Sequence, residues 1–134
     1  GREHLLCGMG VTPIRVNYVV RTVGFLRREG AHRVLFRSDT YQTDALWQVA
    51  KEVTGLRAAF IESSFPNEMD ELARVAKHLT PALLAQEFAK MARPELPVYA
   101  YHLKPRFRDQ IRQELGQLGI PHLTALEEGQ TLVL

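Results

Sequence analysis

Short β-rich segments alternate with segments of helical periodicity between residues 33 and 118, and this alternation limits the folds open to the chain. Apolar residues three or four positions apart predict helices, and the first such set is Leu46, Val49, Ala50 and Val53. Strands that alternate with helices form a sheet with helices packed against it. The sequence therefore predicts an α/β fold, with one mixed sheet and helices mainly on one face.

The individual elements follow from local signals. We predict a hairpin from runs 13–25 and 33–36, strands over 57–62 and 98–101, and a small terminal hairpin from 122–126 and 131–134. We predict four helices, over about 46–53, 67–76, 80–91 and 105–118. Gly55 ends the first helix, Asn67 caps the second with Leu72 facing inward, and Thr80-Pro81 starts the third. Four helices are enough to cover one sheet face, so the other face needs a partner or further sequence to cover it.

Length and composition exclude several classes of protein. The chain has 134 residues, 46% hydrophobic and 24% charged, which predicts a single globular domain over 1–134. Its one cysteine, Cys7, excludes an intrachain disulfide and a cysteine-rich zinc motif. No apolar run has the length of a membrane span, and the first residues do not form a signal peptide, so we expect a cytoplasmic protein without a membrane partner.

Charge is unevenly distributed. The net charge is only +2, and we therefore do not expect a nucleic-acid partner. Residues 1–37 nevertheless carry seven arginines and two glutamates. This basic end has two interpretations: it binds an anionic ligand, or it is a solvated hairpin.

Polar residues follow the predicted strands at positions where α/β proteins bind ligands. Asp39 follows the run 33–36, and His102 follows the strand 98–101. A carboxylate and an imidazole suit Zn, Mn or Fe, but two ligands are one fewer than an open catalytic site usually has. Asp39 is either a ligand or a helix cap, and His102 is either a ligand or a structural histidine.

The other histidines and serines carry less information. His78, in the segment His78-Leu79-Thr80-Pro81, is either part of a loop between helices or a proton donor aimed at the same site. We interpret His4, His32 and His122 as surface or packing residues, because they have no convergent partner. The Ser63-Ser64 pair lacks the G-x-S-x-G context of a serine hydrolase.

Five motifs together resemble a known family. They are Val16–Phe25, Ser38–Trp47, Phe60–Asn67, His78–Pro81 and Tyr101–Pro105. In this order they resemble the C-terminal half of metallo-β-lactamase-fold phosphodiesterases. The resemblance is greatest to class II cyclic-nucleotide phosphodiesterases and more distant to ribonuclease Z. It implies half of an αββα sandwich.

The resemblance also implies roles for individual residues. Asp39 matches the aspartate that bridges two metals, His102 matches the final metal histidine, and His78 matches a histidine near the leaving group that serves as general acid. The family uses its metals to hydrolyse a phosphodiester, so a phosphodiester ligand is implied. Tyr18 stands where the family has another histidine ligand.

Most of the family's metal ligands have no counterpart in residues 1–134. The H-x-H-x-D-H motif of the N-terminal half does not occur, and Ser38 replaces a glycine beside Asp39. We therefore expect no tightly bound metal and no catalysis by this chain alone. Three alternatives follow: a non-catalytic half-domain that forms a homodimer through its sheet face, part of a phosphodiesterase that needs an N-terminal half, or an enzyme whose site is built by two chains that each give Asp39, His78 and His102.

Overall fold

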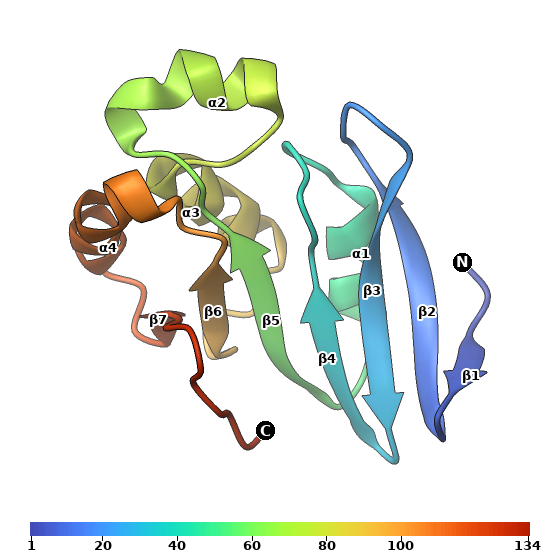
Figure 1. The fold of residues 1–134 in the computed structure, drawn as a ribbon. Coiled ribbons are helices and arrows are strands. Elements are labelled where there is room, and N and C mark those ends of the chain that lie inside the picture. Colours follow the sequence, from blue (N-terminus) through green and yellow to red (C-terminus); the bar gives the residue numbers. More distant parts are fainter.

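The computed structural model describes residues 1–134, which form one seven-stranded sheet with four α-helices (Figure 1). The strands are β1 (His4–Leu6), β2 (Met9–Val16), β3 (Thr22–Glu29), β4 (His32–Phe36), β5 (Leu56–Glu62), β6 (Val98–Tyr101) and β7 (Leu123–Ala125). The helices are α1 (Ala45–Glu52), α2 (Asp70–Ala76), α3 (Pro81–Lys90) and α4 (Arg108–Gly116), with 3-10 turns at Asn67–Met69 and Pro105–Phe107. The predicted mixed α/β architecture is confirmed.

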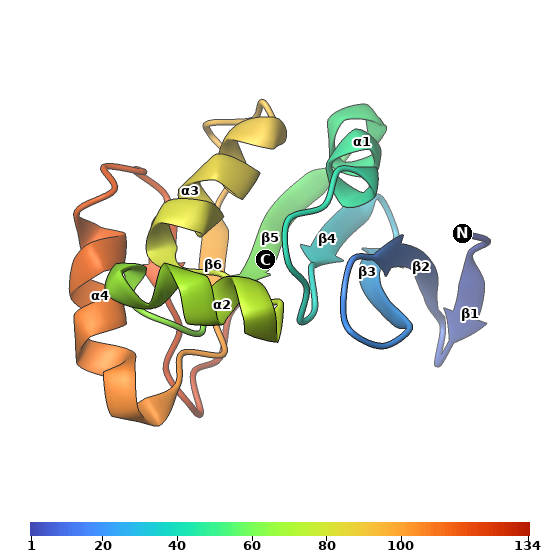
Figure 2. The same ribbon diagram turned by 90° about the horizontal axis from the view of Figure 1, so that it is seen from above.

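The sheet has an antiparallel part and a parallel part. Strands β1 to β4 pair antiparallel, and β4 to β7 pair parallel, so that the spatial order follows the chain. Parallel neighbours require a crossover between them, and helices provide each of these crossovers. Helices α1 and α3 lie on the same side of the sheet (Figure 2). The carboxyl ends of β4, β5 and β6 therefore meet at one edge.

The main core lies between this sheet face and the helices. It contains 19 buried hydrophobic residues, among them Leu35, Trp47 and Ile111. Gly24 of β3 allows α1 to approach closely, because a Cβ atom there would lie 2.5 Å from the Leu46 side chain. None of the four helices has the length and apolar character needed to cross a membrane.

The structure divides one of the predicted strands. The run 13–25 is not one strand but parts of β2 and β3, because residues 17–21 form a loop between them. The Asn17 carbonyl in this loop accepts hydrogen bonds from the Tyr41 amide at 3.0 Å and the Thr40 hydroxyl at 2.6 Å. The loop is therefore held toward the segment that carries Asp39.

The terminal hairpin prediction is wrong. Strand β7 pairs parallel with β6, and residues 131–134 form no strand.

The second predicted helix also differs in detail: the Asn67 side chain accepts from the Ala82 amide of α3 at 2.8 Å, so it caps the following helix. Leu72 is 46% exposed, because α2 lies over the end of the sheet and buries only Ala73 (Figure 1).

The opposite sheet face carries a row of aromatic rings. Phe25, Phe36, Phe60 and Tyr99 occupy matched positions on β3, β4, β5 and β6. The Phe36 and Phe60 rings stack with centroids 4.5 Å apart, and those of Phe60 and Tyr99 are 5.2 Å apart. Their neighbours along the strands, such as Leu35 and Ala59, belong to the core on the helix side. We call this four-ring set the aromatic row.

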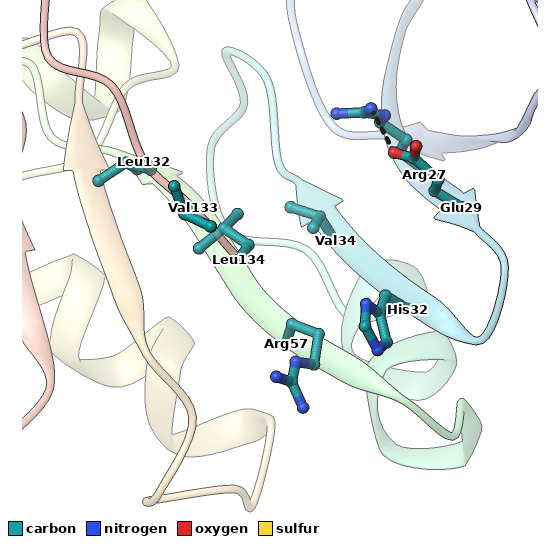
Figure 3. A pocket seen from close by; sticks show the side chains of 8 residues that line it. All are labelled: Arg27, Glu29, His32, Val34, Arg57, Leu132, Val133 and Leu134. Carbon is teal, nitrogen blue, oxygen red and sulfur yellow. Dashed lines mark hydrogen bonds and ion pairs between the residues drawn. The ribbon is translucent and has the colours of Figure 1, made fainter.

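The C-terminal residues cross the same face. Leu132, Val133 and Leu134 lie beside β5 and, with Val34 and Arg57, line a hollow of about 500 Å³ (Figure 3). The hollow lies near the start of β5. The sheet face that the sequence predicts to be bare is therefore partly covered by the end of the chain itself.

Candidate metal and acid–base site

Three polar side chains predicted from the sequence converge at the carboxyl edge of the sheet. Asp39 follows β4, His102 follows β6, and His78 lies between α2 and α3, which are packed near the end of β5. Adjacent parallel strands end at the same edge, so residues distant in the sequence become neighbours. One ligand atom from each of the three lies within 4.8 Å of the other two.

The closest contact in the cluster joins Asp39 and His102. Oδ1 of Asp39 lies 2.9 Å from Nδ1 of His102, and both side chains are about 40% exposed. The rings of His78 and His102 meet edge to face with centroids 5.3 Å apart. The Asp39 side chain makes no helix cap, since residue Asp44 occupies the N-cap position of α1.

Tyr18 also reaches the cluster. Its hydroxyl lies 3.4 Å from Nε2 of His78, and the two rings meet edge to face at 5.7 Å. Partial burial, together with the negative charges of Asp39 and Glu62, raises the pKa of the Tyr18 hydroxyl above its usual value. Tyr18 therefore faces the cluster as a neutral phenol.

A buried carboxylate lies behind the histidines. Glu62 is fully buried at the end of β5, where its carboxylate accepts the Leu79 amide at 2.7 Å and the Ser64 hydroxyl at 2.8 Å. Glu62 Oε1 is 3.5 Å from Nδ1 of His78. The Ser64 hydroxyl lies 3.4 Å from Nδ1 of both His78 and His102. Glu62 and Ser64 thus connect the two rings from inside the protein.

Sequence reasoning missed Glu62 and Ser64 as parts of the site. The signal for Glu62 is a single carboxylate at the end of the otherwise apolar run Ala58–Ile61. A buried carboxylate needs partners that replace water. Such a residue at the end of a buried strand is therefore a candidate site residue.

The backbone is constrained beside each member of the cluster. Ser38, Lys77 and His102 have φ angles of 50°, 59° and 60°, in the left-handed region that favours glycine. Ser38 precedes Asp39, Lys77 precedes His78, and His102 is itself a cluster member. Non-glycine residues in this region persist where the surrounding structure holds them, often at functional sites.

The donor set suits a divalent transition metal. Carboxylate and imidazole are ligand types that Zn, Mn and Fe accept, and three protein ligands are the usual number for an open catalytic site. Asp39 and His102 supply two such ligands, and His78 lies beside them with its ring nitrogens facing Glu62 and Tyr18. His4, His32 and His122 lie outside this cluster.

Neither protein-family models nor curated proteins match this chain. Solved structures do. The metallo-β-lactamase fold protein YhfI from Bacillus subtilis matches with a TM-score of 0.78 and 14% identity, over 96% of this chain and 51% of its own. Human tRNase Z, short form, matches with a TM-score of 0.66 and 17% identity, over 91% and 42%.

Zn²⁺-bound PqqB from Methylobacterium extorquens also matches, with a TM-score of 0.62 and 16% identity, over 99% of this chain and 50% of its own. The chain thus spans about half the length of these structures. Its sheet and helices have the fold of the corresponding half of metallo-β-lactamase proteins.

Proposed function

We propose that this chain contributes one half of the active site of a metal-dependent phosphodiester hydrolase and does not complete that site alone. The convergence of Asp39, His78 and His102 within 4.8 Å carries the proposal. The tRNase name of one similar structure and the zinc bound in another support it. The remaining metal ligands would come from an N-terminal half with the H-x-H-x-D-H motif.

Asp39 and His102 are the residues that would hold a metal ion. Their donor atoms are already 2.9 Å apart, and both side chains are accessible from solvent. A divalent metal supplies Lewis-acid chemistry toward a phosphodiester. Two protein ligands hold such an ion loosely, since affinity grows with the number of ligands placed in advance.

His78 is the residue that would move a proton. Its Nδ1 faces the Glu62 carboxylate at 3.5 Å, and its Nε2 faces the Tyr18 hydroxyl at 3.4 Å. An imidazole with a carboxylate behind one nitrogen is oriented to give a proton from the other. His78 therefore serves as general acid for the leaving oxygen, with Glu62 holding the ring.

Electron paramagnetic resonance of Mn²⁺ tests the metal half of this proposal. Added to the chain, Mn²⁺ is expected to lose part of its free-ion signal, and Asp39→Ala is expected to restore that signal. The His78→Ala variant should bind Mn²⁺ as the wild type does, because the general acid is not a ligand. Equal binding by wild type and Asp39→Ala would refute the proposal.

The aromatic row favours a second candidate function, in which the chain self-associates without catalysis. Phe25 is 37% exposed, and it continues the stacked rings of Phe36 and Phe60 toward the antiparallel edge. Covering apolar surface of this kind with a second sheet is favourable, because the surface is removed from water. A second copy of this chain is the proposed occupant, since it presents a matching row.

A further inference from the structure

A buried arginine, Arg37, stabilises the loop that carries Asp39. Arg37 directly follows β4 and is fully buried, with its Nη2 donating to the Tyr41 carbonyl at 2.8 Å. The Thr40 hydroxyl, which donates its hydrogen to the Asn17 carbonyl, also lies 2.9 Å from the Tyr41 carbonyl. The turn from Arg37 to Tyr41, with Asp39 at its middle, is therefore closed by a side chain that lies beneath it.

Glu87 connects this turn to α3. The buried Glu87 carboxylate accepts from the Arg37 guanidinium at 3.3 Å, from the Trp47 indole at 2.7 Å and from the Thr43 amide at 3.1 Å. Lys90 approaches its other oxygen to 2.7 Å. One carboxylate on α3 thus binds the beginning of α1, the end of the Asp39 loop and the arginine that braces it.

The same helix begins shortly after His78. Thr80 caps α3 through a hydrogen bond from the Leu83 amide to its hydroxyl. Because His78 lies two residues before this cap, the position of α3 determines the position of His78 in the site. We propose that Arg37 and Glu87 are positioning residues that fix Asp39 relative to His78 and His102. The proposal rests on the metal site proposed above, because it assigns the pair a role in shaping that site.

Stability alone does not explain the pair. Nε and Nη1 of Arg37 are buried and have no hydrogen-bond partner. Buried ion pairs with incomplete hydrogen bonding contribute little, and apolar residues of similar size often replace them without loss of stability. The specific contribution of Arg37 is its hydrogen bond to the Tyr41 carbonyl.

The test compares Arg37→Met with a matched control, Arg93→Met. Arg93 also donates to backbone carbonyls, those of Lys51 and Val53, but these lie at the end of α1 and outside the Asp39 loop. In Arg37→Met the Glu87 carboxylate keeps its other partners on α1 and α3. Co²⁺ affinity and the visible spectrum of bound Co²⁺ are measured, with urea unfolding as the measure of stability.

Arg37→Met is expected to weaken Co²⁺ binding about tenfold, the usual effect of losing support behind a ligand, and to change the Co²⁺ spectrum. Arg93→Met should leave the Co²⁺ affinity and spectrum unchanged, with a urea midpoint similar to that of Arg37→Met. Arg37→Lys should restore part of the Co²⁺ affinity. Unchanged Co²⁺ binding in Arg37→Met would overturn the proposal. If Arg37→Met does not fold, Glu87→Gln provides the same comparison, because the amide keeps the shape of the side chain but removes the charge that orients Arg37.

A second measurement separates this proposal from the metal site itself. Hydrogen exchange of the Tyr41 and Thr43 amides is expected to accelerate in Arg37→Met and not in Arg93→Met. If the wild type binds no Co²⁺, the proposed metal site fails, and exchange still decides whether Arg37 braces the loop. Equal exchange in the two variants would show that it does not.

Discussion

Nδ1 of His102 lies 2.9 Å from Oδ1 of Asp39, although the two residues follow different strands. The contact exists because β4 and β6 both pair parallel with β5, so that their carboxyl ends lie on either side of it. The backbone is left-handed at Ser38, which precedes Asp39, and at His102. These two turns direct the side chains of Asp39 and His102 toward each other. The pair is therefore formed by the fold before any ligand is added.

Replacing Ser38 with glycine should stabilise the protein. Ser38 has a φ of 50°, which is unfavourable for a residue with a Cβ atom. The relief of that strain exceeds the extra chain entropy of glycine, for a net gain of about 0.5–1 kcal/mol in the free energy of unfolding. Urea denaturation followed by circular dichroism measures the change.

Ser63→Gly is the control for this prediction. Ser63 is buried in the loop after β5 and has no positive φ, so glycine there should only lower the free energy of unfolding. A loss of stability in Ser38→Gly as large as that in Ser63→Gly would mean that the left-handed turn before Asp39 is not strained.

Local signals predicted the elements that depend on neighbouring residues. Thr80-Pro81 starts α3, with the Thr80 hydroxyl accepting the Leu83 amide. Gly55, with a φ of 68°, follows the end of α1. Asp39 and His102 were identified because polar residues after parallel strands meet at one edge.

Features that depend on distant contacts could not be predicted in this way. Asn67 has the side chain of a helix cap, and only the packing of α3 against the 3-10 turn shows which helix it caps. Residues 131–134 have side chains that favour strands, yet β7 pairs with β6 and leaves them without a partner strand. Glu87 follows Leu83 and Leu84 at helical spacing, and its buried partners Arg37 and Trp47 come from another part of the chain.

The chain alone should not hydrolyse phosphodiesters. Asp39 and His102 provide too few ligands to hold a metal ion firmly. Without a firmly bound metal ion there is no activated nucleophile, and His78 has no reaction in which to act as general acid. We expect no release of p-nitrophenol from bis(p-nitrophenyl) phosphate above the buffer rate, with or without added Mn²⁺ or Zn²⁺. Turnover that disappears in both Asp39→Ala and His102→Ala would show instead that the chain forms a complete site.

The proposed self-association should depend on the aromatic row. Phe25→Asp places a charge in the apolar face and is expected to shift the chain toward the 15.2 kDa monomer. Light scattering on a sizing column at several protein concentrations measures the mass. The wild type should be larger than the monomer at the highest concentrations.

Val75→Asp is the matched control for this substitution. Val75 is 77% exposed on α2, away from the aromatic row, so its replacement should leave the mass unchanged. A wild-type chain that stays at 15.2 kDa throughout would mean that residues 131–134 and the strand side chains already cover the face.

Visible absorption of Co²⁺ tests the proposed metal site most directly, because the ligand-field bands report on the ligands themselves. We predict weak binding of a single ion by the wild type, lost in Asp39→Ala and in His102→Ala. Asp44→Ala, which removes a nearby carboxylate paired with Lys90 outside the cluster, should bind as the wild type does. Binding that survives in both Asp39→Ala and His102→Ala, or no binding by the wild type, would contradict the assignment of these two residues as metal ligands.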